Sequence, residues 1–411
     1  MTKITDIPAI RFKGFSDTWE QRKLGDLADI VGGGTPDTNN SAYWDGDIDW
    51  YAPAEMEGQR YAKGSVRKIT ELGLQKSSAK ILPAHRTVLF TSRAGIGKMA
   101  ILRRPAATNQ GFQSLVLKDG TNPYFIYSMG EKIKDMAEGV ASGSTFLEIS
   151  GKMLGNLEVM VPNLKEQESI ATFFRGIDDL ITLHQRKYDK LTNVKKSMLE
   201  KMFPQNGSNA PEIRFKGFTE AWEQRKVTEI GKIYIGLVTT MTKHYTDEGT
   251  LLIRNSDIKD GKFEFGDNPI YLEKTFAEKN ETRMHQIGDV ITVHTGDVGT
   301  SAVITENEAK SIGFATIVTR PNPKIIDSNY LCSFLNTDKH KKWAVSISTG
   351  DGRTNYNLGD YFELVVPVPS IAEQKKIASY IQKLNRLITL HQRELEKLKN
   401  LKKACLEKMF V

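Results

Sequence analysis

The chain repeats two blocks of its own sequence, and this repeat limits the possible fold more than any single motif does. The first block contains Trp-Glu-Gln-Arg-Lys at Trp19–Lys23 and again at Trp222–Lys226. The second runs from Val161 to Phe203 and returns at Val368–Phe410, with 23 of 43 aligned positions identical. Uniform drift after a gene duplication, the alternative explanation, would not spare two blocks and erase the residues between them. We therefore interpret the chain as a repeated frame that carries two different inserts.

The composition is typical of a globular protein with two to four domains. The chain has 411 residues, of which 39% are hydrophobic and 26% charged. It has no apolar run of the roughly 18 to 20 residues that a bilayer-spanning helix needs, and no signal peptide at its start, so we expect a cytoplasmic protein that does not bind membranes. Cys332 and Cys405 are the only cysteines. They lie too far apart in sequence, without neighbouring ligands, to predict a disulfide or a metal site.

The second repeated block predicts a long helix in each half. Residues 166–203 contain no proline and one glycine. Apolar residues recur in steps of three and four, which is the spacing of a coiled coil. At 1.5 Å per residue, some 38 residues extend about 57 Å, too far to be buried against one small domain. Each helix therefore needs a partner helix, and the predicted seam between them consists of Ile170, Ile177, Ile181, His184, Leu191, Ile377, Leu384, Ile388, His391 and Leu398.

The order of the blocks predicts that the two helices pair antiparallel. A short polar linker, residues 204–213, leads from the first helix into the second half, so the second insert begins near the far end of that helix. A second helix that packs on the first must then return toward the first insert. His184 and His391 fall near the helix midpoints, and we expect them on the seam close to an approximate two-fold axis; solvated side chains are the alternative. No nucleophile or metal-ligand spacing accompanies them.

The inserts predict strand-rich domains. Short β-branched and apolar runs alternate with Gly, Pro, Asn and Asp, and one or two helices are expected in each insert, at 124–138 and 328–345. The predicted class is α+β, with two strand-rich mixed α/β domains, a pair of long antiparallel coiled-coil helices between them and an internal pseudo-two-fold repeat. The expected divisions are a first domain at 1–162, the first helix at 163–203, the linker at 204–213, a second domain at 214–369 and the second helix at 370–411.

A search for catalytic motifs favours a noncatalytic chain. Gly95–Ala100 resembles a dinucleotide-binding fingerprint, but Pro105 excludes the long helix that such a site requires, so we predict a tight turn between strands. Asn122-Pro123-Tyr124 resembles the Asn-Pro-Pro-Tyr loop of amino-methyltransferases, although one proline and any cofactor-binding motif are missing. No P-loop, metalloprotease or hydrolase pattern is present. The sequence therefore predicts no catalytic residues, no cofactor and no metal for this chain.

The net positive charge is concentrated in the two helical blocks, whereas the polar side chains that could contact DNA bases lie in the inserts. The two helical blocks together carry +8 and the whole chain +7, so the remainder is near −1. A solvated coiled-coil surface explains the helical charge equally well. If the inserts bind nucleic acid, polar loops must do so, because Arg can pair with guanine and Asn or Gln with adenine. The candidate DNA-binding residues are Thr91, Ser92, Arg93, Lys98, Asn109, Gln110, Gln113, Ser144, Thr145, His294, Thr295, Asp297, Thr300, Ser301, Arg353, Thr354, Asn355 and Tyr356.

Taken together, the paired motifs resemble the DNA specificity subunit of type I restriction-modification enzymes. The resemblance covers nearly the whole chain: two Trp-Glu-Gln-Arg-Lys segments, Glu-Gln after each Val-Pro at Glu166-Gln167 and Glu373-Gln374, and Leu-Ile-Thr-Leu-His-Gln-Arg at 180–186 and 387–393. It implies two target recognition domains, each of which reads one half of a bipartite double-stranded DNA target. The helical pair would set the gap between the halves.

The resemblance also implies partners. Two modification (methyltransferase) subunits would dock on the helices and bind S-adenosylmethionine, and restriction (motor nuclease) subunits would complete the enzyme. This agrees with the missing cofactor motifs. The main alternative is a coiled-coil scaffold that presents two protein-binding domains; a methyltransferase in its own right and a lone transcriptional DNA binder are others. Sequence-specific DNA binding together with the modification partner distinguishes a specificity subunit from a scaffold.

Overall fold

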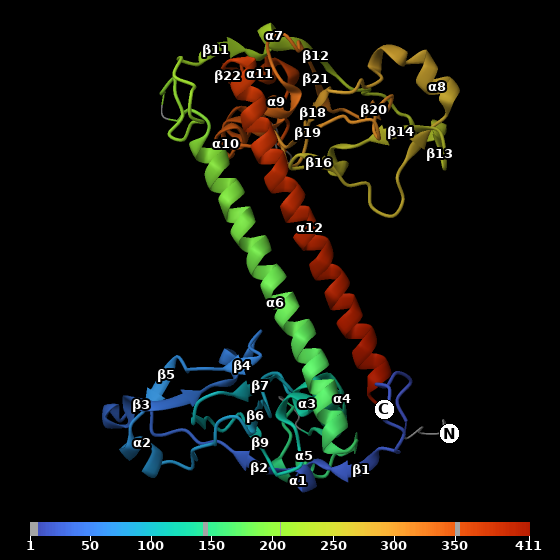
Figure 1. The fold of residues 1–411 in the computed structure, drawn as a ribbon. Coiled ribbons are helices and arrows are strands. Elements are labelled where there is room, and N and C mark those ends of the chain that lie inside the picture. The colour runs from blue at the N-terminus through green and yellow to red at the C-terminus, as the bar shows by residue number, and fades with distance from the viewer. Residues whose placement is uncertain (1–6, 143–146, 206, 350–353) are drawn as a thin grey trace. The chain divides into compact units, whose positions relative to one another are not determined.

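The computed structural model describes residues 7–142, 147–205, 207–349 and 354–411. The chain divides into two compact units: residues 1–183 with 394–411 form the first, and residues 184–393 form the second. Two long helices, α6 (Leu164–Lys201) and α12 (Ile371–Met409), each contribute one part to both units (Figure 1). Strands predominate in the rest of each unit. The predicted α+β class, with two strand-rich parts and two long helices, is therefore confirmed.

The first unit is built on a five-stranded sheet. Its strand order is β2 (Ala28–Gly32), β9 (Gln113–Leu117), β6 (Thr87–Phe90), β7 (Met99–Leu102) and β4 (Tyr61–Ala62). A second sheet contains β5 (Arg67–Ile69), β3 (Trp44–Tyr51) and β8 (Ala107–Thr108). All four side chains of β6 and all four of β7 are buried, which places these two strands at the centre of the unit. The shorter helices are α1 (Leu24–Leu27), α2 (Glu71–Gln75), α3 (Pro123–Ser128), α4 (Gly130–Val140) and α5 (Gly151–Gly155).

The second unit contains two four-stranded sheets. One has the order β12 (Gly231–Ile235), β21 (Ile317–Pro321), β18 (Val290–Thr292), β19 (Ser301–Val303). The other has the order β13 (Tyr245–Thr246), β17 (Tyr271–Leu272), β14 (Thr250–Ile253), β20 (Ile312–Gly313). A small hairpin joins β15 (Ile258–Lys259) to β16 (Lys262–Phe263). The helices are α7 (Val227–Ile230), α8 (Lys274–Lys279), α9 (Ser328–Leu335), α10 (Asp338–Ile347) and α11 (Leu358–Phe362).

The helices expected at 124–138 and 328–345 are each broken in two. Met129 separates α3 from α4, with φ −78° and ψ 3°. In the second unit, Thr337 starts a new helix because its side chain accepts a hydrogen bond from the His340 N–H, which caps α10. The prediction of single helices was wrong because the apolar spacing continues across both breaks, whereas a cap acts at one residue.

The repeated opening block forms a strand in each unit, which the sequence analysis did not predict. β1 (Glu20–Lys23) pairs antiparallel with β10 (Glu158–Val161), the strand that precedes α6. In the same way β11 (Glu223–Lys226) pairs with β22 (Val365–Val368), which precedes α12. Seven of the eight residues of β1 and β11 are exposed and the eighth is half-buried, so neither strand shows the apolar alternation by which a strand is recognised in a sequence.

The repeated Glu-Gln pair links the start of each long helix to its unit. Glu166 accepts two hydrogen bonds from the Arg11 guanidinium, at 2.6 and 2.7 Å, and Glu373 pairs with Arg214 in the same way. Both carboxylates are almost completely buried, and removing one partner of such a pair typically costs about 3–5 kcal/mol. The Gln167 side chain accepts from the Asn122 N–H, at the start of α3. These repeated residues therefore attach the helices to both units.

Each long helix begins in one unit, and its C-terminal end packs into the core of the unit at the opposite end of the helix. Phe203, just after α6, packs in the second unit against Trp222 and Tyr330. Phe410, just after α12, packs in the first unit against Trp19 and Phe174. Along α6 the partner residues in and just after α12 descend in number, from Phe410 opposite Phe174 to Lys402 opposite Asp178. The antiparallel pairing predicted from the chain order is therefore confirmed.

The structure places the predicted seam residues in three environments. The side chains that are buried close to a unit core are Ile170, Ile177, Ile377 and Leu384. Nearer the middle of the helices the side chains are only half-buried, namely Ile181, Leu191, Ile388 and Leu398. His184 and His391 contact each other there. The helical pair is thus densely packed at its ends and loosely packed in the middle.

Candidate nucleic-acid interface

One loop has the same backbone geometry in both units. It joins β6 to β7 in the first unit and β18 to β19 in the second, and we call residues 91–98 and 293–300 the hairpin loops. The Thr91 N–H donates to the Lys98 carbonyl, and the Val293 N–H donates to the Thr300 carbonyl, at 3.1 and 2.8 Å. The expected tight turn between strands is confirmed, since β7 rather than a helix follows the Gly95 motif.

Two corresponding positions in the hairpin loops have left-handed backbone. Ala94 and Gly296 have φ of 54° and 101°, and Gly97 and Gly299 have φ of 87° and 83°. A Cβ on Gly97 would lie 2.5 Å from the Lys134 Cβ of α4. A Cβ on Gly299 would lie 3.1 Å from the His340 ring of α10. Glycine therefore lets each hairpin loop lie directly on a helix, which fixes the loop relative to the core.

A second segment, distant in the sequence, is hydrogen-bonded to the hairpin loop in each unit. The Ile149 N–H donates to the Ser92 carbonyl at 3.0 Å, and the Tyr356 N–H donates to the His294 carbonyl at 2.8 Å. The chain just before Ile149 and Tyr356 contains the predicted loops 142–145 and 350–356. Three residues predicted from these loops, Ser144, Thr145 and Arg353, lie outside the described residues. In each unit, one described residue at or just after a predicted loop, Ile149 or Tyr356, is thus hydrogen-bonded to the hairpin loop.

In the first unit, the segment 108–113 also lies against the hairpin loop. The Ser92 N–H donates to the Gly111 carbonyl at 2.8 Å, and Asn109 Oδ1 accepts from the Gly111 N–H. Thr91 and Ser92 are fully buried, so their side chains are not accessible to DNA. The Thr91 hydroxyl donates to the Gly95 carbonyl at 2.6 Å.

The remaining predicted side chains of the first unit differ in their exposure and in their hydrogen-bond partners. Arg93 and Lys98 are half-buried, and Lys98 Nζ lies 3.2 Å from Glu57. Gln110 is exposed and receives a hydrogen bond from Thr35. Gln113 lies on β9 beside Gly32 and Gly151, which indicates a packing role. Among the described residues predicted for this unit, Arg93, Lys98, Asn109 and Gln110 are therefore the ones with at least partly exposed side chains that do not serve packing.

The second unit has different polar side chains at its hairpin loop. Thr295 donates to Asn355 Oδ1 at 2.9 Å, and His294 Nδ1 lies 2.7 Å from the Thr295 hydroxyl. Burial lowers the pKa of His294 below its ordinary value, so the imidazole is neutral at pH 7 and offers one donor and one acceptor. Asp297 is exposed, and Thr354 is half-buried. Tyr356 is fully buried, so only its backbone belongs to the loop surface.

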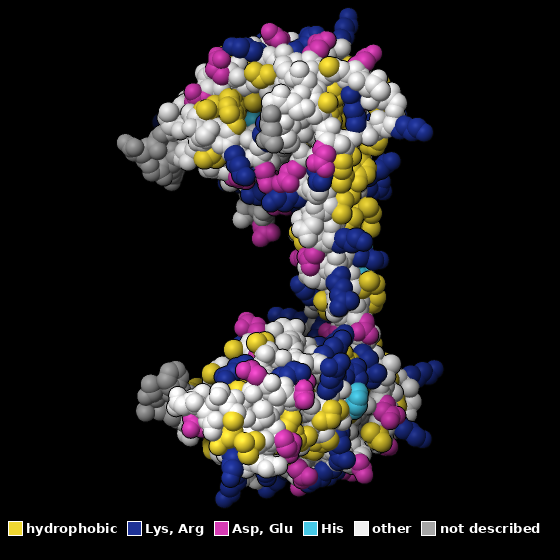
Figure 2. Space-filling model, turned by 90° about the vertical axis from the view of Figure 1, so that its left-hand side faces the viewer, with side chains coloured by type: hydrophobic (Ala, Val, Ile, Leu, Met, Phe, Trp, Pro, Cys, Tyr) yellow, Lys and Arg dark blue, Asp and Glu magenta, His cyan; other side chains and the backbone are white. Residues whose placement is uncertain are grey.

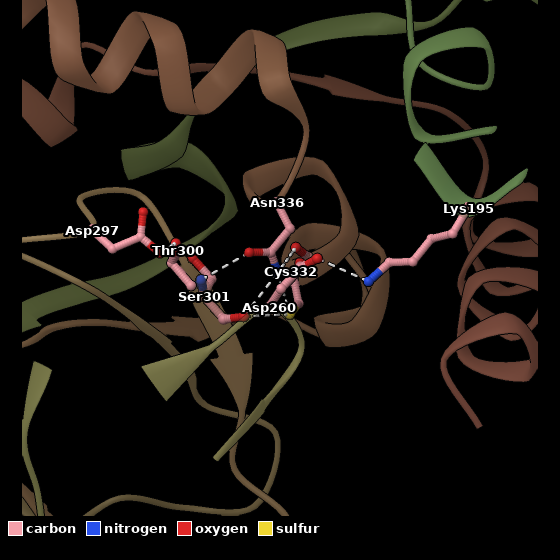
Figure 3. Close-up of polar contacts among 7 residues, drawn as sticks. All are labelled: Lys195, Asp260, Asp297, Thr300, Ser301, Cys332 and Asn336. Atoms are coloured by element: carbon pink, nitrogen blue, oxygen red, sulfur yellow. Dashed lines mark hydrogen bonds and ion pairs between the residues drawn. The ribbon is translucent and has the colours of Figure 1, made fainter. Parts of the chain in front are cut away.

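Thr300 and Ser301 hold the second hairpin loop in place rather than face solvent. Thr300 donates to the exposed Asp297 Oδ2 at 2.8 Å, whereas Thr300 and Ser301 themselves are buried, at 1% exposure or less. Figure 3 shows Asn336 and Cys332 around Ser301. Asn336 Oδ1 accepts from the Ser301 N–H at 3.0 Å, and its amide donates to the Ser301 carbonyl at 2.8 Å. The loop is thereby fastened to the end of α9.

The same network continues to helix α6. The Gly261 N–H, in the turn between β15 and β16, donates to the Ser301 carbonyl at 3.0 Å. The preceding residue, Asp260, accepts from Lys195 of α6 at 2.9 Å (Figure 3). Within the second unit, a continuous set of contacts therefore connects the hairpin loop to the long helix.

Three residues of this arrangement are not among those predicted from the sequence. Asn255 Oδ1 accepts from the His294 N–H at 2.8 Å, and its amide donates to the Ala315 carbonyl at 3.1 Å. Lys195 and Asp260 are 65 residues apart, and no local pattern pairs them. Asn255 carried a weak signal, because an Asn beside a turn commonly bonds to neighbouring backbone.

A cleft lies beside the long helices at corresponding positions in each unit. In the first unit it has a volume of ≈ 570 Å³ and contains Asp178 and Ile181 of α6 and Lys402 of α12. In the second its volume is ≈ 520 Å³, and Asn385 and Ile388 of α12 with Lys195 of α6 take the equivalent places in the repeat. The two helices therefore contribute equivalent positions to a cleft in each unit, and the inserts supply the rest of the lining.

Lysine and arginine side chains, with hydrophobic side chains between them, occupy the visible face of the long helices (Figure 2). Each helix exposes two leucines at equivalent positions of the repeat, Leu180 and Leu183 on α6 and Leu387 and Leu390 on α12, at 43–51% exposure. Within the described ranges, no group of three or more His, Cys, Asp or Glu side chains is arranged to hold a metal ion. Nor is any helix found there that is long and apolar enough to cross a bilayer.

Comparisons with known proteins agree on one family. Residues 16–193 and 219–400 match the sequence model described as the type I restriction modification DNA specificity domain. The MjaIX type I restriction enzyme specificity subunit of Methanocaldococcus jannaschii is 35% identical over 194 residues, which are 45% of this chain and 44% of that protein. The match thus spans less than half the length of that relative.

Two further comparisons cover nearly the whole chain. The putative type I restriction enzyme MjaX specificity subunit, also of Methanocaldococcus jannaschii, is 24% identical over 98% of this chain and 93% of its own length. A crystal structure of the type-I restriction-modification system S subunit from M. genitalium superposes with a TM-score of 0.61 at 16% identity. It covers 98% of this chain and 99% of that one, so the two proteins share a fold.

Proposed function

We propose that this chain, which belongs to the type I restriction modification DNA specificity family, selects the DNA sequence on which a type I restriction-modification enzyme acts. Each unit would read one half of a bipartite target. The observation that carries the proposal is the repeated hairpin loop, in which two backbone hydrogen bonds recur in both units while the side chains differ. A constant frame with variable polar side chains is what reading two unlike half-sites requires.

The chemistry of the two loop surfaces supports different half-sites. In the first unit, Arg93 suits the two acceptors of guanine, and the Gln110 amide suits adenine. In the second unit, His294 and Asn355 offer neutral donors and acceptors, and Thr295 stands at the position that corresponds to Arg93. Backbone and lysine contacts to phosphates would position both units without selecting a sequence.

The long helices would set the gap between the half-sites. Because α6 and α12 are continuous and each ends in the core of a different unit, a change in helix length changes the linkage between the units. Two linked readers gain affinity only if their separation fits the DNA, so the gap becomes part of the specificity.

We further propose that two modification subunits dock on this chain, one beside each cleft, and that restriction subunits complete the enzyme. The doubled cleft and the equivalent exposed leucines offer the same surface twice, which suits two copies of one partner. S-adenosylmethionine would bind to the modification subunits, so this chain would be a noncatalytic component that acts on cytoplasmic DNA. The family match does not favour the alternative of a scaffold for two protein-binding domains.

Replacing Arg93 by alanine tests the reading of the first half-site. In complex with the modification partner, we expect R93A to lower affinity for the cognate DNA by roughly 5- to 150-fold and to remove discrimination at one base pair, because a good bidentate contact contributes about 1–3 kcal/mol. Fluorescence anisotropy with a set of single-base variants measures both effects.

Arg22 provides the matched control, because it is an exposed arginine of the same unit on β1, outside the loops. We expect R22A to keep the base preference of the unsubstituted chain. If R93A weakens binding equally on all sequences, Arg93 contacts only phosphates. A complex without any sequence preference would refute the proposed function itself.

A further inference from the structure

His184 of α6 and His391 of α12 face each other directly within the second unit. Their Nδ1 atoms are 3.1 Å apart, and their ring centroids lie 5.1 Å apart at an interplanar angle of 68°. Both occupy the same position of the repeated Leu-Ile-Thr-Leu-His-Gln-Arg segment, and both are half-buried. The approximate two-fold repeat therefore brings one polar side chain against its own equivalent.

The pair is isolated among apolar and loosely packed positions. One turn away on each helix lie Tyr188 and Ile388, both half-buried, and no residue between 178 and 190 of α6 or between 385 and 394 of α12 is fully buried. Of the contacts seen in the described part of the chain, one hydrogen bond and one ion pair join α6 to α12. The hydrogen bond is the histidine pair. In the middle of the helices, this pair is therefore the main directional contact.

Two facing Nδ1 atoms at this distance need one donor and one acceptor. The pair is satisfied when both imidazoles are neutral with opposite tautomers, and it is also satisfied when one of them is protonated. A second proton would leave two donors and two positive charges in contact. Lys187 on α6 and Glu394 on α12 lie one turn from the histidines, and Lys187 is the charged side chain that acts on the pKa of His391.

We propose that His184 and His391 form a polar layer that fixes the alignment of α6 against α12, and that this layer accepts one proton but not two. Apolar layers tolerate a slip of one heptad, because leucine then faces leucine or isoleucine. A slip would leave both imidazoles without a partner, and a single polar position is an established way to specify register. The consequence for the DNA gap depends on the proposed function; the alignment itself does not.

Leucine substitutions separate the hydrogen bond from simple packing. In H184L or H391L alone, one imidazole remains without its partner, and we expect the thermal midpoint to fall by about 2–4 °C. In the double variant H184L/H391L, an apolar pair replaces the polar one, and we expect a midpoint equal to or above that of the unsubstituted chain. If the double variant loses as much as the two single variants together, the two histidines do not act as a pair.

Distance measurements between spin labels test the alignment. Lys190 and Gln382 are exposed on α6 and α12 within the second unit, and both native cysteines are buried, so labels at K190C and Q382C report on the two helices. We expect one narrow distance distribution with histidines present. In H184L/H391L we expect a second population with an axial offset of about 10 Å, one heptad, because the packed ends oppose a complete shift.

The control is Q185L/Q392L, which places leucines next to the pair and leaves the histidines in contact. It is expected to keep the single narrow distribution. An unchanged distribution in H184L/H391L would overturn the alignment role, whether or not DNA binding is affected.

Acid provides a second, independent readout of the pair. Burial, His184 and Lys187 lower the pKa of His391 below its ordinary value, so the folded state binds fewer protons than the unfolded state as the pH falls through 6.5. Stability from this group is therefore complete above pH 6.5 and is lost below it. His285 and His340, whose pKa values burial lowers to about 4, act in the same direction. The difference between the unsubstituted chain and H184L/H391L isolates the pair.

Thermal midpoints at pH 7.5 and pH 5.5 measure this difference. We expect the unsubstituted chain to lose at least 2 °C more than H184L/H391L over this range. An equal loss in both proteins would show that the pair already tolerates two protons.

In the complete complex, H184L/H391L is expected to bind targets with a wider range of gaps. If the helix alignment is lost without such broadening, the proposal that the helices set the DNA gap fails. The proposal that the histidine pair fixes the alignment then still stands.

Discussion

Exchanging residues 24–157 for the corresponding insert of another family member is expected to change one half of the DNA target completely and to leave the other half unchanged. The exchanged segment carries the first hairpin loop and its sheet, whereas β1, β10, α6 and α12 stay in place. The second unit has its own core, between Leu199 and Leu384, which does not include the exchanged residues. Determination of the methylated sequence in cells that carry the chimera measures both halves at once.

The boundary of this exchange follows from the strand pair β1–β10. A cut inside β10 would separate residues that pair with the repeated Glu20–Lys23 segment, so the exchange ends at residue 157. The mirror exchange of the second insert serves as the control and is expected to alter only the other half. A chimera in which both halves change would contradict the independence of the two units.

Inserting four residues into α6 within 180–191, with a matching insertion at the equivalent place in α12, is expected to lengthen the preferred gap and to keep both half-site sequences. Four helical residues add about 6 Å, and base pairs are about 3.4 Å apart, so the gap should grow by roughly two base pairs. The segment is loosely packed, and the helix ends in both unit cores are untouched. Binding to a series of targets that differ only in gap length measures the shift.

Insertion into α6 alone is the control for this experiment. It shifts the antiparallel partners past each other and is expected to weaken binding to every target in the series. If the matched insertions altered a half-site sequence at an unchanged gap, the helices would not act as the spacer.

The two long helices and their pairing could be predicted from the sequence because the residues that form them are repeated in both halves of the chain. The repeated Val161–Phe203 block predicted two long helices whose observed bounds, Leu164–Lys201 and Ile371–Met409, differ by only a few residues from the expected ones. Their antiparallel pairing followed from the order of the segments. Buried runs such as Thr87–Phe90 were also recognisable, since all their side chains are apolar or β-branched.

The candidate site was predictable only in part, because exposure depends on contacts between distant residues. Thr91, Ser92, Thr300 and Ser301 have the polar side chains of a DNA contact, yet the hairpin geometry turns them inward. Asn255 and the Lys195–Asp260 pair support a loop that is distant from them in the sequence. The repeated Trp-Glu-Gln-Arg-Lys segment shows the same limit, because its strand depends on pairing with residues some 140 positions later.

The central claim is that the two units of this chain read two unlike half-sites at a fixed separation. Mapping of methylated adenines across a genome, with this gene present and with it deleted, tests that claim most directly. The account predicts one bipartite motif, two different specific sequences around a gap of constant length, that is methylated only when the gene is present. A continuous or palindromic motif, or a methylation pattern that does not change on deletion, would contradict it.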